Sequence, residues 1–252
     1  MAPLIDVNDV TKTYWLGEVT VNALAGVTVE IEKGSYVAIM GPSGSGKSTF
    51  MNLIGCLDRP TSGQYLLGGM AVESLDRDQL AEIRNQKIGF VFQNFNLLPR
   101  MNALENVKLP LLYKETDTPD ADEQAQRALS LVGLAGRERN LPTQLSGGQQ
   151  QRVAIARALI TNPRVILADE PTGNLDSTAS HGIMRLLRRS TEELGVTVLM
   201  VTHDPVCASY GDRVVRLVDG RVVEDIDVTD REENAVLARS AAAVVEFRRR
   251  DE

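Results

Sequence analysis

The sequence has few cysteines, no long apolar run and no surplus of positive charge, and each shortage excludes a class of protein. Two cysteines, Cys56 and Cys207, in 252 residues cannot form a disulfide scaffold, and their separation is not that of metal ligands. No stretch approaches the roughly 20 apolar residues of a membrane helix, and no apolar segment of a cleaved signal follows Met1. The formal net charge is −7, with 27 Lys and Arg against 34 Asp and Glu, which argues against a protein that coats nucleic acid. We therefore expect a soluble protein of a reducing compartment, with no nucleic-acid partner.

What the sequence does contain is a series of short apolar runs separated by helical segments. Hydrophobic residues make up 43% of the chain, enough for a sizeable core. Strands are predicted at 27–31, 36–40, 64–67, 88–92, 165–168 and 197–201, and a hairpin with an Asp219-Gly220 turn at 214–223. Helices are predicted at 47–57, 120–132 and 149–160. Strands that alternate with helices indicate an α/β fold with a parallel sheet.

The middle of the chain, about residues 94–162, is predicted to be mostly helical. It lies between two predicted strands and therefore has the position of an insertion. The segment after Thr229 is rich in alanine and ends near Arg248-Arg249-Arg250. We predict a helical or frayed tail there and assign it no function.

A glycine-rich loop follows the predicted strand at 36–40 and precedes a predicted helix. Its residues match G-x-x-x-x-G-K-[ST] in full: Gly41-Pro42-Ser43-Gly44-Ser45-Gly46-Lys47-Ser48-Thr49. Glycines let backbone N–H groups converge on phosphate oxygens, and the helix N-terminus adds a favourable dipole. Lys47 would contact the β- and γ-phosphates, and the Ser48 hydroxyl would bind Mg²⁺. A turn that only caps a helix is the alternative, which the flanking strand and helix disfavour.

Two acids, Asp169 and Glu170, follow the apolar run at 165–168. Ligands bind at the carboxyl ends of strands in open parallel sheets, so we expect these two acids at the sheet edge where a nucleotide would bind. Asp169 would orient Mg²⁺ through water, and Glu170 would polarise the attacking water. Solvated acids at a strand end before Pro171 are the alternative.

Each of the two histidines has a different setting. His203 follows the predicted strand at 197–201, at the same sheet edge, where its imidazole could contact the γ-phosphate or the attacking water. A capping or core histidine is the alternative. His181 lies on a predicted helix, and we expect it on a solvated face.

The motif that indicates a family lies just upstream of the acidic pair. Leu145-Ser146-Gly147-Gly148-Gln149-Gln150-Gln151-Arg152 is similar to the signature sequence of the ATP-binding cassette (ABC) ATPases. The resemblance covers about residues 4–225. It implies that Tyr14 stacks on adenine, that Gln93 is the Q-loop glutamine and a further Mg²⁺ ligand, that Leu175-Asp176 is the D-loop, and that His203 is the H-loop residue.

The resemblance also implies a fold and a subfamily. The fold is a RecA-like P-loop core with an antiparallel β subdomain and an inserted helical subdomain. Residues 1–228 would form one domain, with the helical subdomain at about 94–162 and a tail at 229–252. The segments that resemble the group containing MacB, LolD and FtsE are 12–14, 54–58, 89–93, 103–107 and 167–176. Asn174 stands where many relatives have Ala, and Trp15 beside Tyr14 leaves open which ring carries the base.

The signature has a local physical interpretation of its own. Ser146 would cap a helix, and Gly147 and Gly148 would permit close approach of an anion. A cap without a ligand is the alternative. The resemblance implies a head-to-tail homodimer in which each ATP lies between the phosphate loop of one copy and Ser146–Gln149 of the other. Asp176 would lie along that interface, or would cap the helix that begins at Ser177.

The implied function is an ATP-hydrolysing subunit that powers a separate membrane permease, for export or force transmission. An FtsE-like ATPase that moves no solute and acts on an FtsX-like envelope partner is the alternative. Soluble ABC proteins of DNA repair or translation are disfavoured because coiled-coil arms, zinc-binding cysteines and a second cassette are lacking. The protein would be cytoplasmic and peripheral on the inner face of the membrane. Four apolar residues near the Q-loop could line a docking groove for the permease or belong to the core: Phe95, Leu97, Leu98 and Met101.

Overall fold

The computed structural model describes residues 2–17, 19–114 and 118–228, so the predicted tail at 229–252 lies outside the described residues. The chain divides into two compact units. Unit 1 contains the residues up to Leu75 and those from Leu199 onward, and unit 2 contains Asp76–Val198. The boundary falls within strand β8 (Thr197–Val201). The proposed domain limits, with a helical subdomain at 94–162, stay a prediction.

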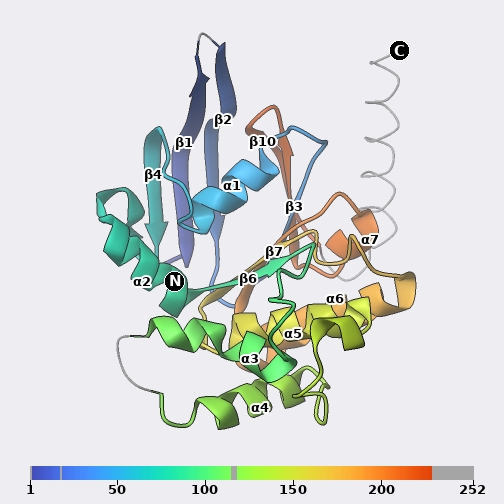
Figure 1. Ribbon diagram of the computed structural model, residues 1–252. Coiled ribbons are helices and arrows are strands. Elements are labelled where there is room, and N and C mark those ends of the chain that lie inside the picture. The colour runs from blue at the N-terminus through green and yellow to red at the C-terminus, as the bar shows by residue number, and fades with distance from the viewer. Residues whose placement is uncertain (1, 18, 115–117, 229–252) are drawn as a thin grey trace. The chain divides into compact units, whose positions relative to one another are not determined.

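Unit 1 contains an antiparallel sheet of order β2-β1-β4-β5, whose longer strands lie side by side in Figure 1. The strands are β1 (Ile5–Leu16), β2 (Val19–Ile31), β4 (Ser62–Leu67) and β5 (Met70–Ala71). The predicted strand at 27–31 is the end of the longer β2. Its alternation places Val27, Val29 and Ile31 in the core, as a half-buried strand requires.

The second strand set of unit 1 carries the loops of interest. β3 (Tyr36–Met40) is buried throughout and pairs in parallel with β9 (Arg213–Val218), which pairs with the antiparallel β10 (Arg221–Asp227). Asp219 and Gly220 have φ of 48° and 72°, the left-handed conformation that a two-residue hairpin turn needs. The predicted hairpin is confirmed, with a longer second strand.

Two helices complete the described part of unit 1, α1 (Lys47–Ile54) and α7 (Pro205–Ala208). The predicted helix at 47–57 ends earlier than expected. Cys56 adopts a left-handed φ of 54°, and the N–H of Leu57 returns to the carbonyl of Asn52, which closes the helix. Cys56 and Cys207 are both buried, and they form no disulfide with each other.

Unit 2 contains β6 (Ile88–Phe92) and β7 (Val165–Asp169), which pair in parallel with Phe92 opposite Asp169. α5 (Gly147–Leu159) packs closely on β6. A Cβ at Gly89 of β6 would lie only 2.5 Å from the carbonyl oxygen of Ala158 in α5. Glycine at that position lets helix and strand approach each other.

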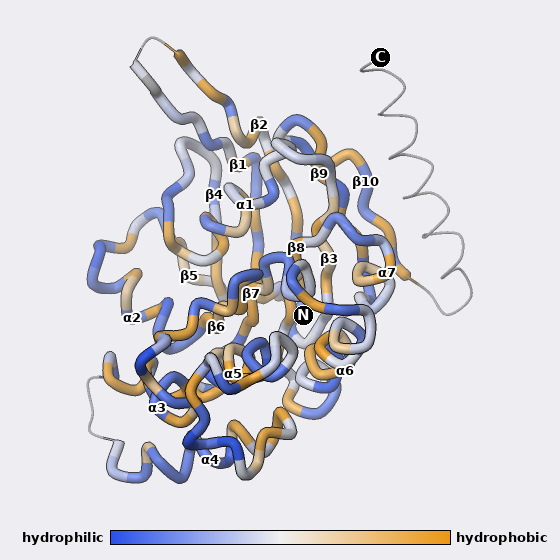
Figure 2. Tube along the Cα trace, turned by 45° about the vertical axis from the view of Figure 1, so that its right-hand side comes forward, coloured by the Kyte–Doolittle hydropathy of each residue, from blue (hydrophilic) through white to orange (hydrophobic). Residues whose placement is uncertain are grey.

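Further helices of unit 2 are α2 (Arg77–Lys87), α3 (Ala103–Lys108), α4 (Ala121–Leu131) and α6 (Ser177–Leu194). Short 3₁₀ turns lie at Leu109–Tyr113 and Pro142–Gln144 in this unit, and at Val72–Ser74 in unit 1. In Figure 2 these helices alternate hydrophilic and hydrophobic stretches, as expected of helices with one buried face. None of the helices in the described ranges is long and apolar enough to cross a membrane.

Candidate functional site

The phosphate loop lies between β3 and α1 in unit 1, and close contacts with neighbouring backbone give it its shape. Gly41 has φ 154°, and a Cβ there would lie 2.1 Å from the carbonyl oxygen of Leu217. Gly46 has φ 99°, and its Cβ would lie 2.5 Å from the carbonyl oxygen of Ala23. Gly220 N–H also donates to the carbonyl of Ser45 at 3.0 Å. At positions 41 and 46 only glycine fits this path.

The loop concentrates hydrogen-bond donors and positive charge. Lys47 Nζ donates to the carbonyls of Gly41 and Pro42 at 2.8 and 2.6 Å, so its ammonium lies within the curve of the loop. Gly46 at the N-cap of α1 supplies no capping side chain, and the first turn carries no acid. The amides of that turn are therefore suited to an anion. The buried Ser45 Oγ has no hydrogen-bond partner within the described ranges.

The two candidate adenine-stacking rings differ in how they are held. The Tyr14 hydroxyl donates to Asp58 Oδ2 at 2.9 Å, and Lys12 Nζ lies 2.6 Å from Asp58 Oδ1 and 4.9 Å from the centre of the Tyr14 ring. Partial burial and the bond to Asp58 raise the pKa of Tyr14. The neighbouring Trp15 is 67% exposed. Tyr14 is thus the anchored ring.

His203 lies just beyond β8 and is exposed. The preceding residue, Thr202, donates its N–H to the carbonyl of Ile39 at 3.1 Å, and its Oγ1 accepts from Asp204 N–H at 3.0 Å. The start of the H-loop is therefore tied to the end of β3, from which the phosphate loop leaves. His181 is exposed on α6, as predicted.

The two acids predicted from the sequence lie at the end of β7 in unit 2. Asp169 is the last residue of β7, opposite Phe92, and Gln93 follows directly after Phe92. Both acids are half-buried, and Glu170 has a left-handed φ of 45°. The parallel pairing therefore brings Gln93 and Asp169 to the same sheet edge. The sequence predicted this edge for the two acids, whereas Gln93 was implied only by the family resemblance.

Two side chains of α5 hold the Q-loop, and neither could be assigned this role from the sequence. Gln151 is fully buried, and its Nε2 donates to the carbonyls of Phe92 and Pro171 at 3.3 and 2.6 Å. Arg157 donates to the carbonyls of Phe95 and Asn96, and burial lowers the pKa of its guanidinium. The only indication in the sequence is a polar residue within the apolar face of a predicted helix, and this does not show which backbone groups its side chain binds.

The signature segment opens α5 with reciprocal capping bonds. Ser146 Oγ accepts from Gln149 N–H at 3.3 Å, and Gln149 Oε1 accepts from Ser146 N–H at 2.9 Å. A Cβ at Gly147 would lie 3.2 Å from Leu175, and one at Gly148 would lie 3.0 Å from Ala179. The signature and the D-loop are therefore neighbours within unit 2.

Asp176 caps α6, since its Oδ1 accepts from Ala179 N–H at 2.8 Å. The predicted cap is present at both Ser146 and Asp176. Capping does not by itself show a contact with nucleotide, so the contact of Ser146 and Asp176 with ATP stays a prediction.

The candidate residues are divided between the two units. Tyr14, the phosphate loop and His203 belong to unit 1, and the others belong to unit 2.

The chemistry of the candidate metal ligands suits Mg²⁺. Ser48, Gln93 and Asp169 offer hydroxyl, amide and carboxylate oxygens, which are the hard donors that Mg²⁺ prefers. Among the described residues no group of three or more His, Cys, Asp or Glu forms a metal cluster.

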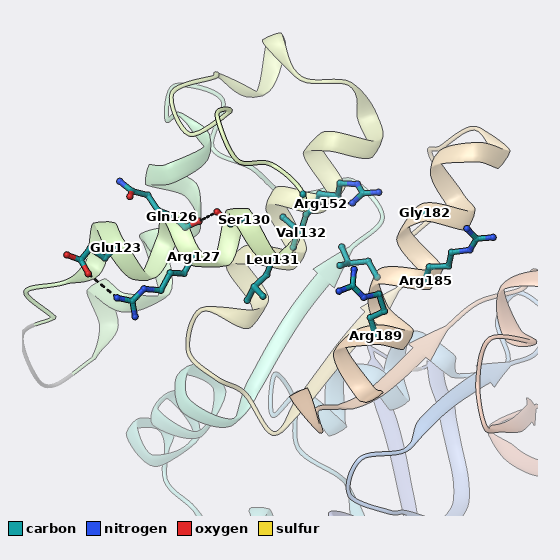
Figure 3. Close-up of a pocket in the computed structure, with 12 residues that line it drawn as sticks. Glu123, Gln126, Arg127, Ser130, Leu131, Val132, Arg152, Gly182, Arg185 and Arg189 are labelled. Atoms are coloured by element: carbon teal, nitrogen blue, oxygen red, sulfur yellow. Dashed lines mark hydrogen bonds and ion pairs between the residues drawn. The ribbon is translucent and has the colours of Figure 1, made fainter. Parts of the chain in front are cut away.

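A groove of about 1360 Å³ lies on a different part of unit 2, between α4, α5 and α6 (Figure 3). Arginine side chains line it, together with Leu131 and Val132: Arg127, Arg152, Arg185 and Arg189. None of the candidate nucleotide or metal residues lines this groove. It is therefore separate from the chemistry described above.

The family is decided by comparison with known proteins. The sequence matches the ABC transporter family over residues 24–173, more than half of the chain. The chain belongs to the ABC transporter family. An ABC transporter relative from Syntrophobacter fumaroxidans, the macrolide export ATP-binding/permease protein MacB, is 55% identical over 86% of this chain. The match covers 31% of that protein's length.

Shorter members of the ABC transporter family match over nearly their whole length. The uncharacterized ABC transporter ATP-binding protein MJ0796 of Methanocaldococcus jannaschii is 52% identical over 87% of this chain and 95% of its own. A dimeric structure of that cassette, in a post-hydrolysis state with ADP and Pi, superposes with a TM-score of 0.82 at 48% identity. It covers 90% of this chain and 99% of that one. The predicted fold class and the predicted MacB/LolD/FtsE-like group are confirmed.

Proposed function

We propose that this ABC transporter chain is the ATP-hydrolysing, nucleotide-binding subunit of a MacB-type transporter. The observation that carries the proposal is the phosphate loop, in which neighbouring backbone leaves no room for a Cβ at Gly41 or Gly46. The loop belongs to a chain whose α5 begins with the capped signature Ser146-Gly147-Gly148-Gln149. The ADP and Pi named for the MJ0796 cassette support ATP as the substrate.

Each candidate residue has a role in that reaction. Lys47 and the loop amides bind the phosphates, Tyr14 stacks on adenine, and His203 contacts the γ-phosphate. Ser48, Gln93 and Asp169 would hold Mg²⁺, which neutralises phosphate charge when bound. Glu170 accepts a hydrogen bond from the attacking water and polarises it.

We infer a homodimer with ATP at its interface. The MJ0796 cassette is described as dimeric in two structures, which supports the inference at about 50% identity. Ser146–Gln149 and Asp176 of one copy would then meet the nucleotide held by the other. Hydrolysis would remove the γ-phosphate and so release the two copies.

The partner is a membrane permease on whose cytoplasmic side this chain is peripheral. The MacB relative is named as an ATP-binding/permease protein, and the matched segment is about a third of its length, which supports a permease as the part that works with this ABC transporter segment. Around the Q-loop, Phe95, Leu97 and Met101 are half-buried and Leu98 is 45% exposed, which favours a docking groove over core packing. Because MacB is named for macrolide export, transport is favoured over an FtsE-like action on an FtsX-like partner.

The Glu170→Gln variant tests the proposal. The amide cannot act as a base toward water, so turnover should fall by roughly 100-fold or more while ATP binding is kept. With ATP and Mg²⁺ the variant should elute as a dimer in size-exclusion chromatography and without nucleotide as a monomer. Hydrolysis at a near wild-type rate would remove Glu170 from its role. A strictly monomeric, ATP-loaded variant would overturn the dimer.

A further inference from the structure

The Q-loop has an unusual backbone that side chains from elsewhere in unit 2 hold in place. Phe95 and Asn96 both have left-handed φ, 60° and 48°, which costs free energy for residues other than glycine. Gln151 and Arg157 of α5 bind carbonyls at the beginning and end of this loop. Hydrogen bonds from buried side chains can maintain such a conformation. Gln151 is fully buried and Arg157 is half-buried.

A third side chain holds the loop from its exposed side. Asn174 Nδ2 donates to the carbonyl oxygen of Gln93 at 3.1 Å and to Asn94 Oδ1 at 2.8 Å. Asn174 lies in the turn that connects Glu170 to α6. That turn is closed by Gly173 N–H to the carbonyl of Glu170 at 3.0 Å.

The side chain of Gln93 lies on the same turn. A Cβ at Gly173 would be 2.6 Å from Gln93 Nε2 and 3.0 Å from Gln93 Cδ. The main chain of Gln93 is therefore bound by Asn174, and its side chain is packed on Gly173. The turn after Glu170 therefore contacts both the main chain and the side chain of Gln93.

We propose that Asn174 is a positioning residue that latches the Q-loop to the segment following Glu170. The latch holds the Gln93 amide, a proposed Mg²⁺ ligand, in register with the carboxylate that polarises water. It makes no contact with nucleotide of its own. The proposal rests on the function proposed above, because it assigns Asn174 an effect on the same reaction.

The two bonds of Asn174 are solvent-exposed, which makes their effect on folding small. Water can replace an exposed hydrogen bond, so removal of Asn174 should leave the melting temperature within about a degree or two of wild type. Water cannot reproduce the position that the bonds give to Gln93. The effect should therefore appear in the Mg²⁺ requirement and in kcat.

The test compares Asn174→Ala with the isosteric Asn174→Asp in the full chain. The alanine variant loses the latch, and the Mg²⁺ concentration for half-maximal ATPase activity should rise by about fivefold, the size expected for one or two net hydrogen bonds. The aspartate variant places a carboxylate against the carbonyl oxygen of Gln93, which can only accept, and should raise that concentration further. ATP binding measured in EDTA should not change, because no Mg²⁺ is bound.

Two further variants make the result specific. Asn85→Ala removes another asparagine-to-carbonyl bond, the part-buried one from Asn85 Nδ2 to the carbonyl of Pro110 at 2.7 Å, and should leave the Mg²⁺ requirement unchanged. Asn94→Ala combined with Asn174→Ala should be less than additive, since both remove the same bond. Wild-type Mg²⁺ dependence in both Asn174 variants would overturn the latch. Absence of Mg²⁺-dependent hydrolysis in the wild type would instead overturn the proposed function.

Discussion

The loops of unit 1 and of unit 2 are shaped by different means. In unit 1 the phosphate loop follows a path on which Gly41 and Gly46 leave no room for a side chain, and its contacts are with backbone carbonyls. In unit 2 the segments that carry the other candidate residues are held by side chains. Ser146 and Asp176 cap helices, and Gln151 binds the Q-loop.

The difference has a consequence for how each site can change. A loop whose path requires glycine has a backbone conformation that residues with a Cβ cannot adopt. A loop held by single side-chain bonds can be released one bond at a time, each at roughly 1 kcal/mol. Unit 1 is therefore suited to holding a nucleotide, and unit 2 to responding to one.

Lys47→Ala should have the largest effect of the three. It removes the one ammonium that lies within the phosphate loop, and a charge-assisted bond contributes about 1.5–3 kcal/mol. ATP affinity measured by equilibrium dialysis should fall by roughly 10- to 100-fold, with folding preserved. Lys33→Ala, at an exposed lysine of the same unit, is the matched control and should bind ATP as the wild type does. Undiminished binding by Lys47→Ala would contradict the assignment of the loop.

The same contrast explains which parts could be predicted from the sequence. The glycines at 41 and 46 are required by backbone geometry, so the motif could be identified without any knowledge of its neighbours. The Asp219-Gly220 turn was predictable for the same reason. Buried runs such as 88–92 and 165–168 gave strands within one residue of those observed. These features are local in sequence.

Features that depend on distant partners could not be predicted. Arg157 is 61 and 62 residues from the carbonyls that it binds, and nothing near it in the sequence indicates them. The shift of the α1 end to Ile54 depends on the left-handed Cys56. α2 could not be predicted, although Asp76 and Gln79 form a capping box at its start, because its apolar residues are few.

Ser146→Asp should have an intermediate effect and separates the two roles of the signature. Aspartate is as good an N-cap as serine, so the free energy of unfolding should stay within about 0.5 kcal/mol of wild type. A carboxylate that faces the proposed γ-phosphate should prevent the ATP-dependent dimer by charge repulsion. Denaturant unfolding and size-exclusion chromatography of the Glu170→Gln background with this change measure the two effects.

Ser146→Ala is the reference for that experiment. It should lose about 1 kcal/mol of stability through the missing cap and should retain more dimer than the aspartate variant. If the aspartate variant dimerises as well as its parent does, Ser146 is a cap without a ligand. Unit 2 would then have no contact with the γ-phosphate through Ser146, and its proposed response to a bound nucleotide would lose its basis.

Asp58→Asn should have the smallest effect and tests whether unit 1 also uses a side-chain clamp. Partial burial alone would raise the pKa of Asp58, but hydrogen bonds from Lys12, Arg59 N–H and Tyr14 lower it overall. A lowered folded-state pKa stabilises the fold above the unfolded value near 4, and this contribution is lost as the pH falls through the folded-state pKa. At pH 7 the variant should lose less than about 1 kcal/mol, because the ion pair is partly exposed.

The pH dependence of that loss shows whether the charge of Asp58 stabilises unit 1. The difference in unfolding free energy between wild type and Asp58→Asn should be present at pH 7 and shrink below pH 4, since only the wild-type carboxylate takes up a proton there. Tyr14→Phe removes the hydroxyl bond and keeps the ring, so ATP affinity should stay within about twofold while the pKa of Asp58 rises. A difference that does not vary with pH would show that the Asp58 charge does not stabilise the Tyr14 ring. The anchoring of Tyr14 would then rest on packing alone, as the phosphate loop rests on its glycines.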